Sequence, residues 1–306
     1  MNITNDNIPN ICANCGKGEE SSTNLKACTA CKMVKYCNRE CQIAHRPQHK
    51  KACKKRAAEL YDEELFKQPP PEYGDCPICM IRVPSLYTGW RYQTCCGKVI
   101  CSGCAYAPVY DNEGNVVADT CPFCRTSTPI SDAEIVKRNE KRAKAGDAIA
   151  IHDLGCNYAS GDDGYPQDDT KAFELYQRAG EHGHANAYYS ISNAYLRGDG
   201  VEVDEKKAIH YWELAAIRGH PIARNNLGIS EWKAGKYDRA VKYFMIAARD
   251  GNPNSVKHVK LLYEQGLATK EDYSKALESY QAYLDEIKSD QRDKAAAAHV
   301  SFKYYE

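Results

Sequence analysis

The sequence has no surplus of charge of either sign and no long hydrophobic run. Its 306 residues include 41 Lys and Arg and 41 Asp and Glu, so the formal net charge is zero. A chain held on nucleic acid by bulk charge alone would be strongly basic, and this class is excluded. No run approaches the roughly 18 apolar residues that a membrane-spanning helix needs. We therefore expect no membrane partner.

The first residues also lack the features of a secretory signal. Residues 1–6 contain neither a basic segment nor the start of an apolar one, so we expect an intracellular protein of the cytoplasm, the nucleus or both. Thiols stay reduced in these compartments, which argues against disulfides among the 16 cysteines. Many cysteines in a reducing compartment indicate metal binding. No nucleotide-binding glycine loop or hydrolase serine motif is present.

The cysteines divide the chain into parts. Seven lie from Cys12 to Cys53 and eight from Cys76 to Cys124, while Cys156 stands alone and fits a small apolar position of a helix. Prolines 69–71 between the clusters must be extended. The length suits two or three domains. We expect a first zinc module at 1–56, a linker at 57–74, a second zinc module at 75–128 and a helical region at 129–306.

The region after the cysteines repeats itself. Gly146, Gly183, Gly219 and Gly251 recur at intervals of about 32 to 37 residues, which is typical of a helical solenoid. Each unit has helical spacing of Ala and Tyr, then a break, then a second helix. Small alanines allow two helices to approach, and the tyrosines fill the remaining space, so we interpret the tyrosine stripe as packing.

One segment of this region carries a family resemblance. Residues 195–201, with Asp204 and Lys207, resemble a Sel-one-like repeat, a relative of the tetratricopeptide repeat. The first unit matches through residues 161–168, whereas residues 233–240 have the tighter tetratricopeptide turn. The resemblance implies about four repeats and a C-terminal capping helix.

The first cysteine cluster has the spacing of zinc ligands. Its four pairs are Cys12 and Cys15, Cys28 and Cys31, Cys37 and Cys41, and His49 and Cys53. Zinc prefers four tetrahedral ligands, and a two-residue gap lets both thiolates reach one ion. Ligands separated by three residues lie one helical turn apart on one face, so we expect the last two pairs on short helices. Eight donors make two zinc sites.

Residues 36–53 closely resemble a MYND zinc finger. In that family alternate pairs share an ion, which implies one set of Cys12, Cys15, Cys37 and Cys41 and another of Cys28, Cys31, His49 and Cys53. MYND fingers mostly bind short proline-containing peptides, and Arg46 stands where the family often has an aromatic residue. His45 falls at a family histidine position outside the ligand set.

Nucleic acid is the alternative partner of this first module. Residues 1–56 have 11 Lys and Arg and 4 Asp and Glu. The two zinc–thiolate sets would carry three negative charges, so the surplus of seven falls to four. This patch is modest and has no base-stacking aromatics, which does not favour nucleic acid.

The second cluster also provides eight thiols. Its pairs are Cys76 and Cys79, Cys95 and Cys96, Cys101 and Cys104, and Cys121 and Cys124. The opening Cys-Pro-Ile-Cys and closing Cys-Pro-Phe-Cys strongly resemble a RING finger. In that family the first and third pairs share one ion, and the second and fourth share the other. With the two sites of the first module, we therefore expect the chain to bind four zinc ions.

This RING-like module departs from the family at Lys98, which stands where histidine is usual. Lysine is protonated at neutral pH and is a poor zinc ligand. Cys95 must then supply the missing donor, immediately beside Cys96.

The resemblance implies recruitment of a ubiquitin-conjugating enzyme. Ile78 and Pro122 would contact that enzyme, and Arg125 would bridge it to ubiquitin with its fork of donors. The plainer interpretation is that Ile78 and Pro122 pack within the two Cys-x-x-Cys loops, or zinc knuckles, and that Arg125 is solvated. The expected catalysis would orient a thioester without a covalent intermediate.

We therefore expect a multi-domain chain, with two small zinc-stabilised modules followed by an all-α helical-repeat solenoid. The leading hypothesis is a protein-interaction adaptor with RING-type ubiquitin ligase activity. Its competitor is a non-enzymatic scaffold that only binds proteins. A methyltransferase bearing a MYND finger is a third possibility, but no catalytic segment for it is recognisable.

Overall fold

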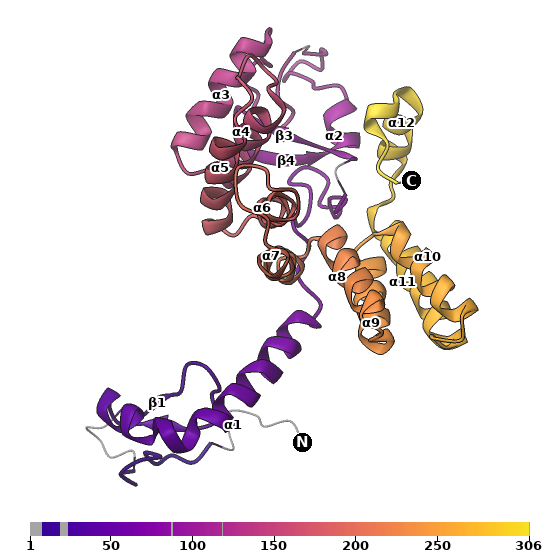
Figure 1. The fold of residues 1–306 in the computed structure, drawn as a ribbon. Coiled ribbons are helices and arrows are strands. Elements are labelled where there is room, and N and C mark those ends of the chain that lie inside the picture. The colour runs from indigo at the N-terminus through magenta and orange to yellow at the C-terminus, as the bar shows by residue number, and fades with distance from the viewer. Residues whose placement is uncertain (1–7, 19–23, 87, 118, 306) are drawn as a thin grey trace. The chain divides into compact units, whose positions relative to one another are not determined.

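The structure is a computed structural model that describes residues 8–18, 24–86, 88–117 and 119–305. The chain forms two compact units, Met1–Lys67 and Gln68–Glu306 (Figure 1). Residues 1–6, on which the expectation about a secretory signal rests, lie outside the described residues. Within the described part of the chain, no helix has both the length and the apolar character needed to cross a bilayer.

The first unit combines a small hairpin with one long helix. Strands β1 (Lys26–Ala27) and β2 (Lys35–Tyr36) pair antiparallel, and helix α1 (Arg39–Leu65) follows. The Asn38 side chain accepts a hydrogen bond from the Cys41 backbone N–H and caps this helix. The helix runs on through residues 57–65, so this part of the expected linker is helical.

The second unit begins with an extended segment and the RING-like module. Strands β3 (Trp90–Gln93) and β4 (Lys98–Cys101) pair antiparallel, with Trp90 opposite Cys101. The short helix α2 (Ser102–Tyr106) follows directly. Buried Val83 and Ile100 pack with the cysteines, and this core is small.

Helices form the rest of the second unit and pack as successive hairpins (Figure 1). Their bounds are α3 (Asp132–Lys144), α4 (Ala148–Ser160), α5 (Asp169–Glu181), α6 (Ala185–Arg197), α7 (Glu205–Ile217), α8 (Pro221–Lys233), α9 (Tyr237–Arg249), α10 (Pro253–Glu264), α11 (Lys270–Ile287) and α12 (Asp290–Ala298), followed by the 3-10 helix η2 (Val300–Phe302). The expected fold class, zinc modules followed by an all-α repeat solenoid, is confirmed.

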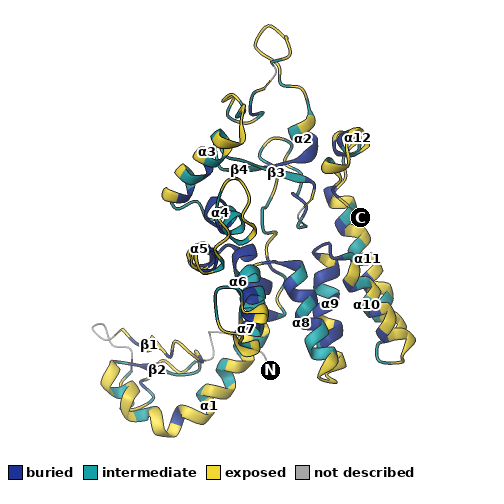
Figure 2. Ribbon diagram, turned by 45° about the horizontal axis from the view of Figure 1, so that its top comes forward, coloured by how far each residue is buried: buried dark blue, intermediate teal, exposed yellow. Residues whose placement is uncertain are grey.

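Small residues allow the two helices of a repeat to approach closely. A Cβ atom added at Gly228 of α8 would lie 2.5 Å from Cε1 of Phe244 in α9. One added at Gly155 of α4 would lie 2.8 Å from Cε1 of Tyr176 in α5. Figure 2 shows that buried residues gather where neighbouring helices of the array meet. Tyr176 and Tyr195 belong to this core, as expected for packing tyrosines.

The RING-like module is attached to the beginning of the helical array. Arg142 of α3 donates from Nε to the Thr94 carbonyl at 2.7 Å and from Nη2 to the Cys95 carbonyl at 3.0 Å. The Tyr92 hydroxyl donates to Asp147 Oδ2 at 2.7 Å. Three hydrogen bonds therefore join β3 and the loop after it to α3 and the turn before α4.

The same module is also attached to the end of the array. Arg292 of α12 is fully buried and donates to the carbonyls of Arg82 at 2.8 Å and Ile81 at 3.1 Å. It also donates to the Ile287 carbonyl at 2.6 Å, at the end of α11. The RING-like module thus contacts helices from both ends of the array and forms one unit with them.

We expect Arg292→Met to destabilise the second unit by about 3–5 kcal/mol, because several buried carbonyls lose their donor. At about 2–4 °C per kcal/mol, the melting temperature should fall by about 6–20 °C. Thermal melting followed by circular dichroism measures this. Arg249→Met is the control, since Arg249 is exposed and its loss should shift the transition little. Equal shifts for both variants would contradict a fastening role for Arg292.

Candidate zinc centres

The first unit brings eight candidate ligands into two sets. Cys12, Cys15, Cys37 and Cys41 form one set, and Cys28, Cys31, His49 and Cys53 form the other. Within each set the donor atoms all lie within 4.8 Å of one another. The Cys31 Sγ atom lies 3.2 Å from Nε2 of His49.

The ligands on helices are arranged differently from our expectation of separate short helices. Cys41, His49 and Cys53 all lie on α1, which is one helix of 27 residues. Cys37 precedes the capping residue Asn38 and is not helical. One long helix therefore supplies ligands to both sets, and its register fixes the two sets relative to each other.

At Cys12 and His49 the pKa shifts favour the form of the side chain that binds metal. Burial acts to raise the pKa of Cys12, but backbone N–H groups of Cys15 and Cys37 outweigh it, and the pKa is lowered to about 6. Burial lowers the pKa of His49, which keeps the ring neutral and able to ligate. His45 instead lies with Nδ1 3.1 Å from the Tyr36 hydroxyl and stacks on His49.

The RING-like module brings its eight thiols into two further sets. Cys76, Cys79, Cys101 and Cys104 form one, and Cys95, Cys96, Cys121 and Cys124 form the other. Both sets combine alternate pairs, as in a cross-brace. A hydrogen bond from the Cys101 thiol is the largest cause that lowers the pKa of Cys76 to about 4.

The adjacent Cys95 and Cys96 both belong to the same set. Cys124 Sγ lies 3.4 Å from Cys95 Sγ, and Cys96 Sγ lies 4.0 Å from Cys121 Sγ. A turn makes this possible, because Gly97 has φ of 69°. The Lys98 ammonium lies 5.9 Å from the centre of the Phe123 ring, outside the set.

The distances between sulfur atoms fit zinc. Tetrahedral zinc–thiolate bonds of about 2.3 Å place two sulfurs about 3.8 Å apart. The Cys15–Cys37, Cys28–Cys53 and Cys79–Cys101 pairs are separated by 3.7, 3.8 and 3.7 Å. Each set offers four protein donors, so a zinc ion held there would have no open coordination position and would stabilise the fold.

Two arginines that support the RING-like zinc loops had no signal in the sequence. Arg142 and Arg292 lie far along the chain from the loops whose carbonyls they bind. Neither lies in a ligand motif, and only the folded array brings them to the zinc module. Residues of this kind orient the ligands that they support.

The three residues assigned to a conjugating enzyme lie on the two knuckles of the RING-like module. Ile78 is 41% exposed, Pro122 is half-buried, and the neighbouring Phe123 is 41% exposed. Arg125 is exposed and donates from Nη1 to the Tyr110 carbonyl at 2.9 Å. Exposed apolar side chains on both knuckles are a candidate contact surface.

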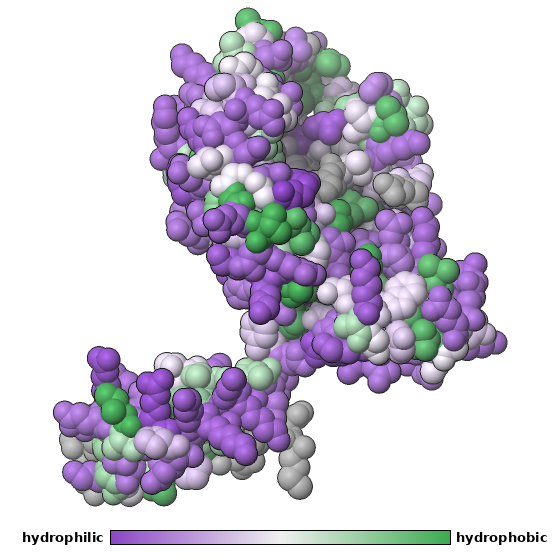
Figure 3. Space-filling view, viewed as in Figure 1, coloured by the Kyte–Doolittle hydropathy of each residue, from purple (hydrophilic) through white to green (hydrophobic). Residues whose placement is uncertain are grey.

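The first unit has a basic cavity of 470 Å³ beside the zinc ligand His49. Four cationic side chains line it: Arg39, Arg46, Lys50 and Lys54. Ile43 is exposed and adds an apolar contact. Most residues of this unit on the face drawn in Figure 3 are hydrophilic.

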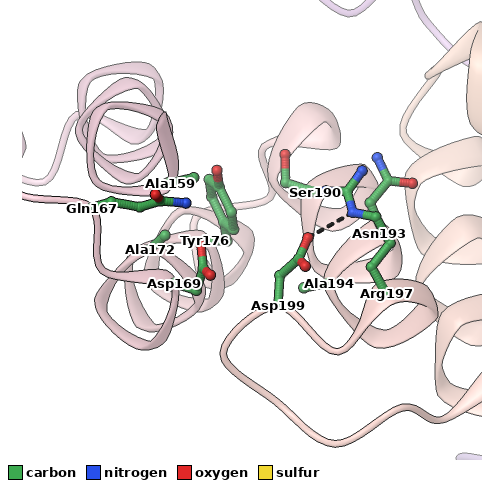
Figure 4. A pocket seen from close by; sticks show the side chains of 10 residues that line it. All are labelled: Ala159, Gln167, Asp169, Ala172, Tyr176, Ser190, Asn193, Ala194, Arg197 and Asp199. Carbon is green, nitrogen blue, oxygen red and sulfur yellow. Dashed lines mark hydrogen bonds and ion pairs between the residues drawn. The ribbon is translucent and has the colours of Figure 1, made fainter. Parts of the chain in front are cut away.

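A smaller cavity of 210 Å³ lies between the first two repeats (Figure 4). Arg197 Nε donates to Asp199 Oδ2 at 2.6 Å in its wall. Its ten lining residues include no cysteine and no histidine. Cys156 is half-buried nearby in the core, with Sγ 3.7 Å from Nε2 of His152. We assign no chemistry to this cavity.

We expect Cys95→Ser to lower the bound zinc from four ions per chain to three, because it removes one donor from one of the four sets. Lys98→Ala should retain all the zinc, because Lys98 lies outside the set. Elemental analysis of protein purified under reducing conditions measures both. Loss of zinc from the Lys98 variant, or full zinc in the Cys95 variant, would contradict this ligand assignment.

Comparison with curated proteins finds partial relatives. The chain is 28% identical over 138 residues to "Chitin synthase regulatory factor 4" of Schizosaccharomyces pombe, covering 45% of this chain and 22% of that protein. It is 33% identical over 90 residues to "Chitin synthase regulator SKT5" of Saccharomyces cerevisiae, covering 29% and 13%. It is 27% identical over 175 residues to "DAP3-binding cell death enhancer 1" of Rattus norvegicus, covering 44% and 33%. The chain thus matches a third or less of the length of these relatives.

Among solved structures, a Sel1 repeat protein from Oxalobacter formigenes is similar, with 30% identity and a TM-score of 0.44. The match covers 57% of this chain and 67% of that one. The protective antigen c5321 of uropathogenic Escherichia coli is 27% identical, with a TM-score of 0.42 over 53% of this chain and 35% of that one.

Family models match both the first unit and the helical array. The MYND finger model matches residues 12–53, and the Sel1 repeat model matches residues 148–184, 185–220 and 261–281. These matches agree with the zinc sets of the first unit and with the repeated helical hairpins of the second. The chain carries a MYND zinc finger followed by an array of Sel1 repeats.

Proposed function

We propose that this zinc-binding protein-interaction adaptor recruits a ubiquitin-conjugating enzyme through its RING-like module. The finger and the repeats would select protein partners, and the module would present the enzyme to them. The names of the relatives describe regulators and a binding protein, which supports an adaptor. The single observation that carries the ligase proposal is the exposed apolar surface on the two zinc knuckles.

The two zinc sets hold the exposed side chains of that surface in fixed positions, as recruitment of an enzyme requires. Ile78 and Phe123 come from knuckles that belong to different zinc sets, so the two metals together fix their separation. Arg125 follows the last ligand directly, and one of its N–H groups binds the Tyr110 carbonyl. Its guanidinium has further donors, which we assign to the bridge between enzyme and ubiquitin. The module would raise the rate of ubiquitin transfer by holding the thioester in a reactive orientation.

The second candidate function is a scaffold without ligase activity. The hydrogen bonds of Arg142 and Arg292 tie the RING-like module to both ends of the array, which also suits a purely structural role. The two functions differ in whether the exposed knuckles have a partner, and this can be measured directly.

We expect the purified chain to autoubiquitinate with at least one member of a panel of conjugating enzymes, and Ile78→Ala and Arg125→Ala each to reduce the rate about tenfold or more. A gel assay with ubiquitin, activating enzyme and ATP measures this. Val203→Ala and Arg197→Ala are matched controls on the repeats, where both residues are exposed. No activity with any enzyme would favour the scaffold, and activity unaffected by either knuckle variant would refute the roles assigned to these residues.

For the MYND finger we propose an acidic, proline-containing peptide as the ligand. The basic lining of its cavity complements carboxylates, and Arg46 replaces the aromatic side chain that would favour a purely apolar ligand. Charge complementarity of this kind weakens as salt screens it.

We expect Arg46→Ala to weaken binding of a proline-containing peptide with two glutamates by about threefold to tenfold, since one charged contact is lost. Fluorescence anisotropy of the labelled peptide at low and high salt measures this. Lys55→Ala removes the same charge from an exposed position of α1 outside the cavity and is the control. An uncharged peptide of the same length that binds equally well would contradict the proposed specificity.

A further inference from the structure

The turns between repeats form a row along the array, which we call the corner surface. It consists of the residues that precede the first helix of each repeat: Gly146 and Asp147, Gly183 and His184, Gly219 and His220, and residues 250–252. The sequence repeats these positions at the regular interval already described. A row of equivalent backbone turns offers equivalent contacts to anything extended along it.

Residues 68–73, which we call the strap, lie along this surface. Gln68 Nε2 donates to Asp250 Oδ1 at 2.6 Å. The Pro70 carbonyl oxygen lies at the Gly219 corner, and Glu72 Oε1 lies 3.9 Å from Nδ1 of His184. The strap thus advances two residues for each repeat and runs in the direction opposite to the repeats. An extended ligand bound along a repeat array is expected to show such a constant number of residues per repeat.

The middle of the strap has a preformed extended conformation. Proline fixes φ near −65°, and three prolines in succession favour the polyproline II helix. No described residue has a cis peptide bond. Pro69 is buried while Pro70 and Pro71 are exposed, so one ring contacts the array and the others face solvent. Such a segment loses little conformational entropy on binding, which is why proline-rich ligands are recognised in this form.

Gly219 lies in close contact with the backbone of the strap. A Cβ atom added there would lie 2.8 Å from the Pro70 carbonyl oxygen, which is too close for a real contact. Gly219 also has φ of 91°, in the left-handed region. Gly235 has φ of 75° in another turn of the array, but nothing lies within 4 Å of its added Cβ. The two glycines share the backbone constraint, and only Gly219 contacts the strap.

The end of the strap is held by a buried acid and an aromatic ring. The Glu72 side chain is 5% exposed, and within the described part of the chain neither carboxylate oxygen has a hydrogen-bond partner of normal geometry. Burial raises the pKa of Glu72 to about 7, against the opposing effect of His152 and the Asn186 backbone N–H. Asn186 Nδ2 donates to the Tyr73 hydroxyl at 2.8 Å, and the Tyr73 ring lies 4.7 Å from that of Trp90.

Glu72 lies where helix α6 needs an acceptor. His184, the N-cap residue of α6, makes no side-chain cap hydrogen bond, whereas Asp147, His220 and Asn252 cap the corresponding helices with their own side chains. A helix start favours a negative group supplied by another segment. Because the hydrogen bonding of Glu72 is imperfect, the strap binds the corner surface less stably than it could. This is expected of a segment that a second peptide can replace.

We propose that the corner surface is a binding site for an extended proline-rich peptide ending in glutamate and an aromatic residue, and that residues 68–73 occupy it as a built-in ligand. A partner that carries this pattern binds by displacing the strap. The inference is independent of the ligase activity, because it involves neither knuckle. It assigns the recognition surface of the Sel1 repeats to the turns between them.

The test uses the full chain with the strap replaced by six alternating glycines and serines. The probe is a fluorescein-labelled peptide of residues 66–75. The strap variant should bind this peptide at least about tenfold more tightly than the wild type, whose own strap competes at an effective concentration in the millimolar range. Gly219→Ala in the strap variant should weaken binding about tenfold, whereas Gly235→Ala should not.

Circular dichroism distinguishes the remaining outcomes. If the strap variant is less helical than the wild type, the peptide added in trans should restore its helix content and melting temperature, because a ligand stabilises the state that binds it. Failure of a folded strap variant to bind the peptide, or failure of the peptide to restore an unfolded one, overturns the proposal. Equal effects of the two glycine substitutions overturn the assignment of the site.

Discussion

Closure of four donors around a zinc ion is the interaction on which the rest of the structure depends. Both zinc modules are small and have few buried apolar residues apart from their cysteines. Domains of about 50 residues bury too little surface to fold on a hydrophobic core alone. A structural zinc site contributes about 10–16 kcal/mol of apparent binding free energy that is also folding free energy. Metal therefore determines whether these modules are folded at all.

Zinc also explains a buried charge elsewhere in the second unit. Arg292 is fully buried, and its hydrogen bonds go to carbonyl groups of the module and of α11. The Cys76 thiol and burial raise the pKa of Cys101, and the charge of Arg292 acts in the opposite direction. A zinc ion with four thiolates has a net charge of −2, which offsets the cost of burying the guanidinium. The metal set and the last helix are thus electrostatically linked.

The sequence was informative where the chemistry is local and periodic. Ligand spacing predicted the donor pairs, the family resemblances implied the sets into which the structure brings them, and the interval between Gly183 and Gly219 predicted the repeats. It was uninformative where contacts join distant parts of the chain. Nothing around Arg292 indicates that it binds the Ile81 carbonyl, because that contact exists only after ten helices have stacked. The helical pattern after the finger is local, and helix α1 continues through residues 57–65, which contain no helix-breaking residue.

The regular spacing of the repeats gives these distant contacts a common origin. The first corner binds the RING-like module through Asp147 and Tyr92, while later corners bind the strap, and Asp250 contacts both Gln68 and Arg82. One row of turns therefore positions both the extended segment and the zinc module that follows it. The array thus sets the spacing of the contacts along the segment that precedes it in sequence.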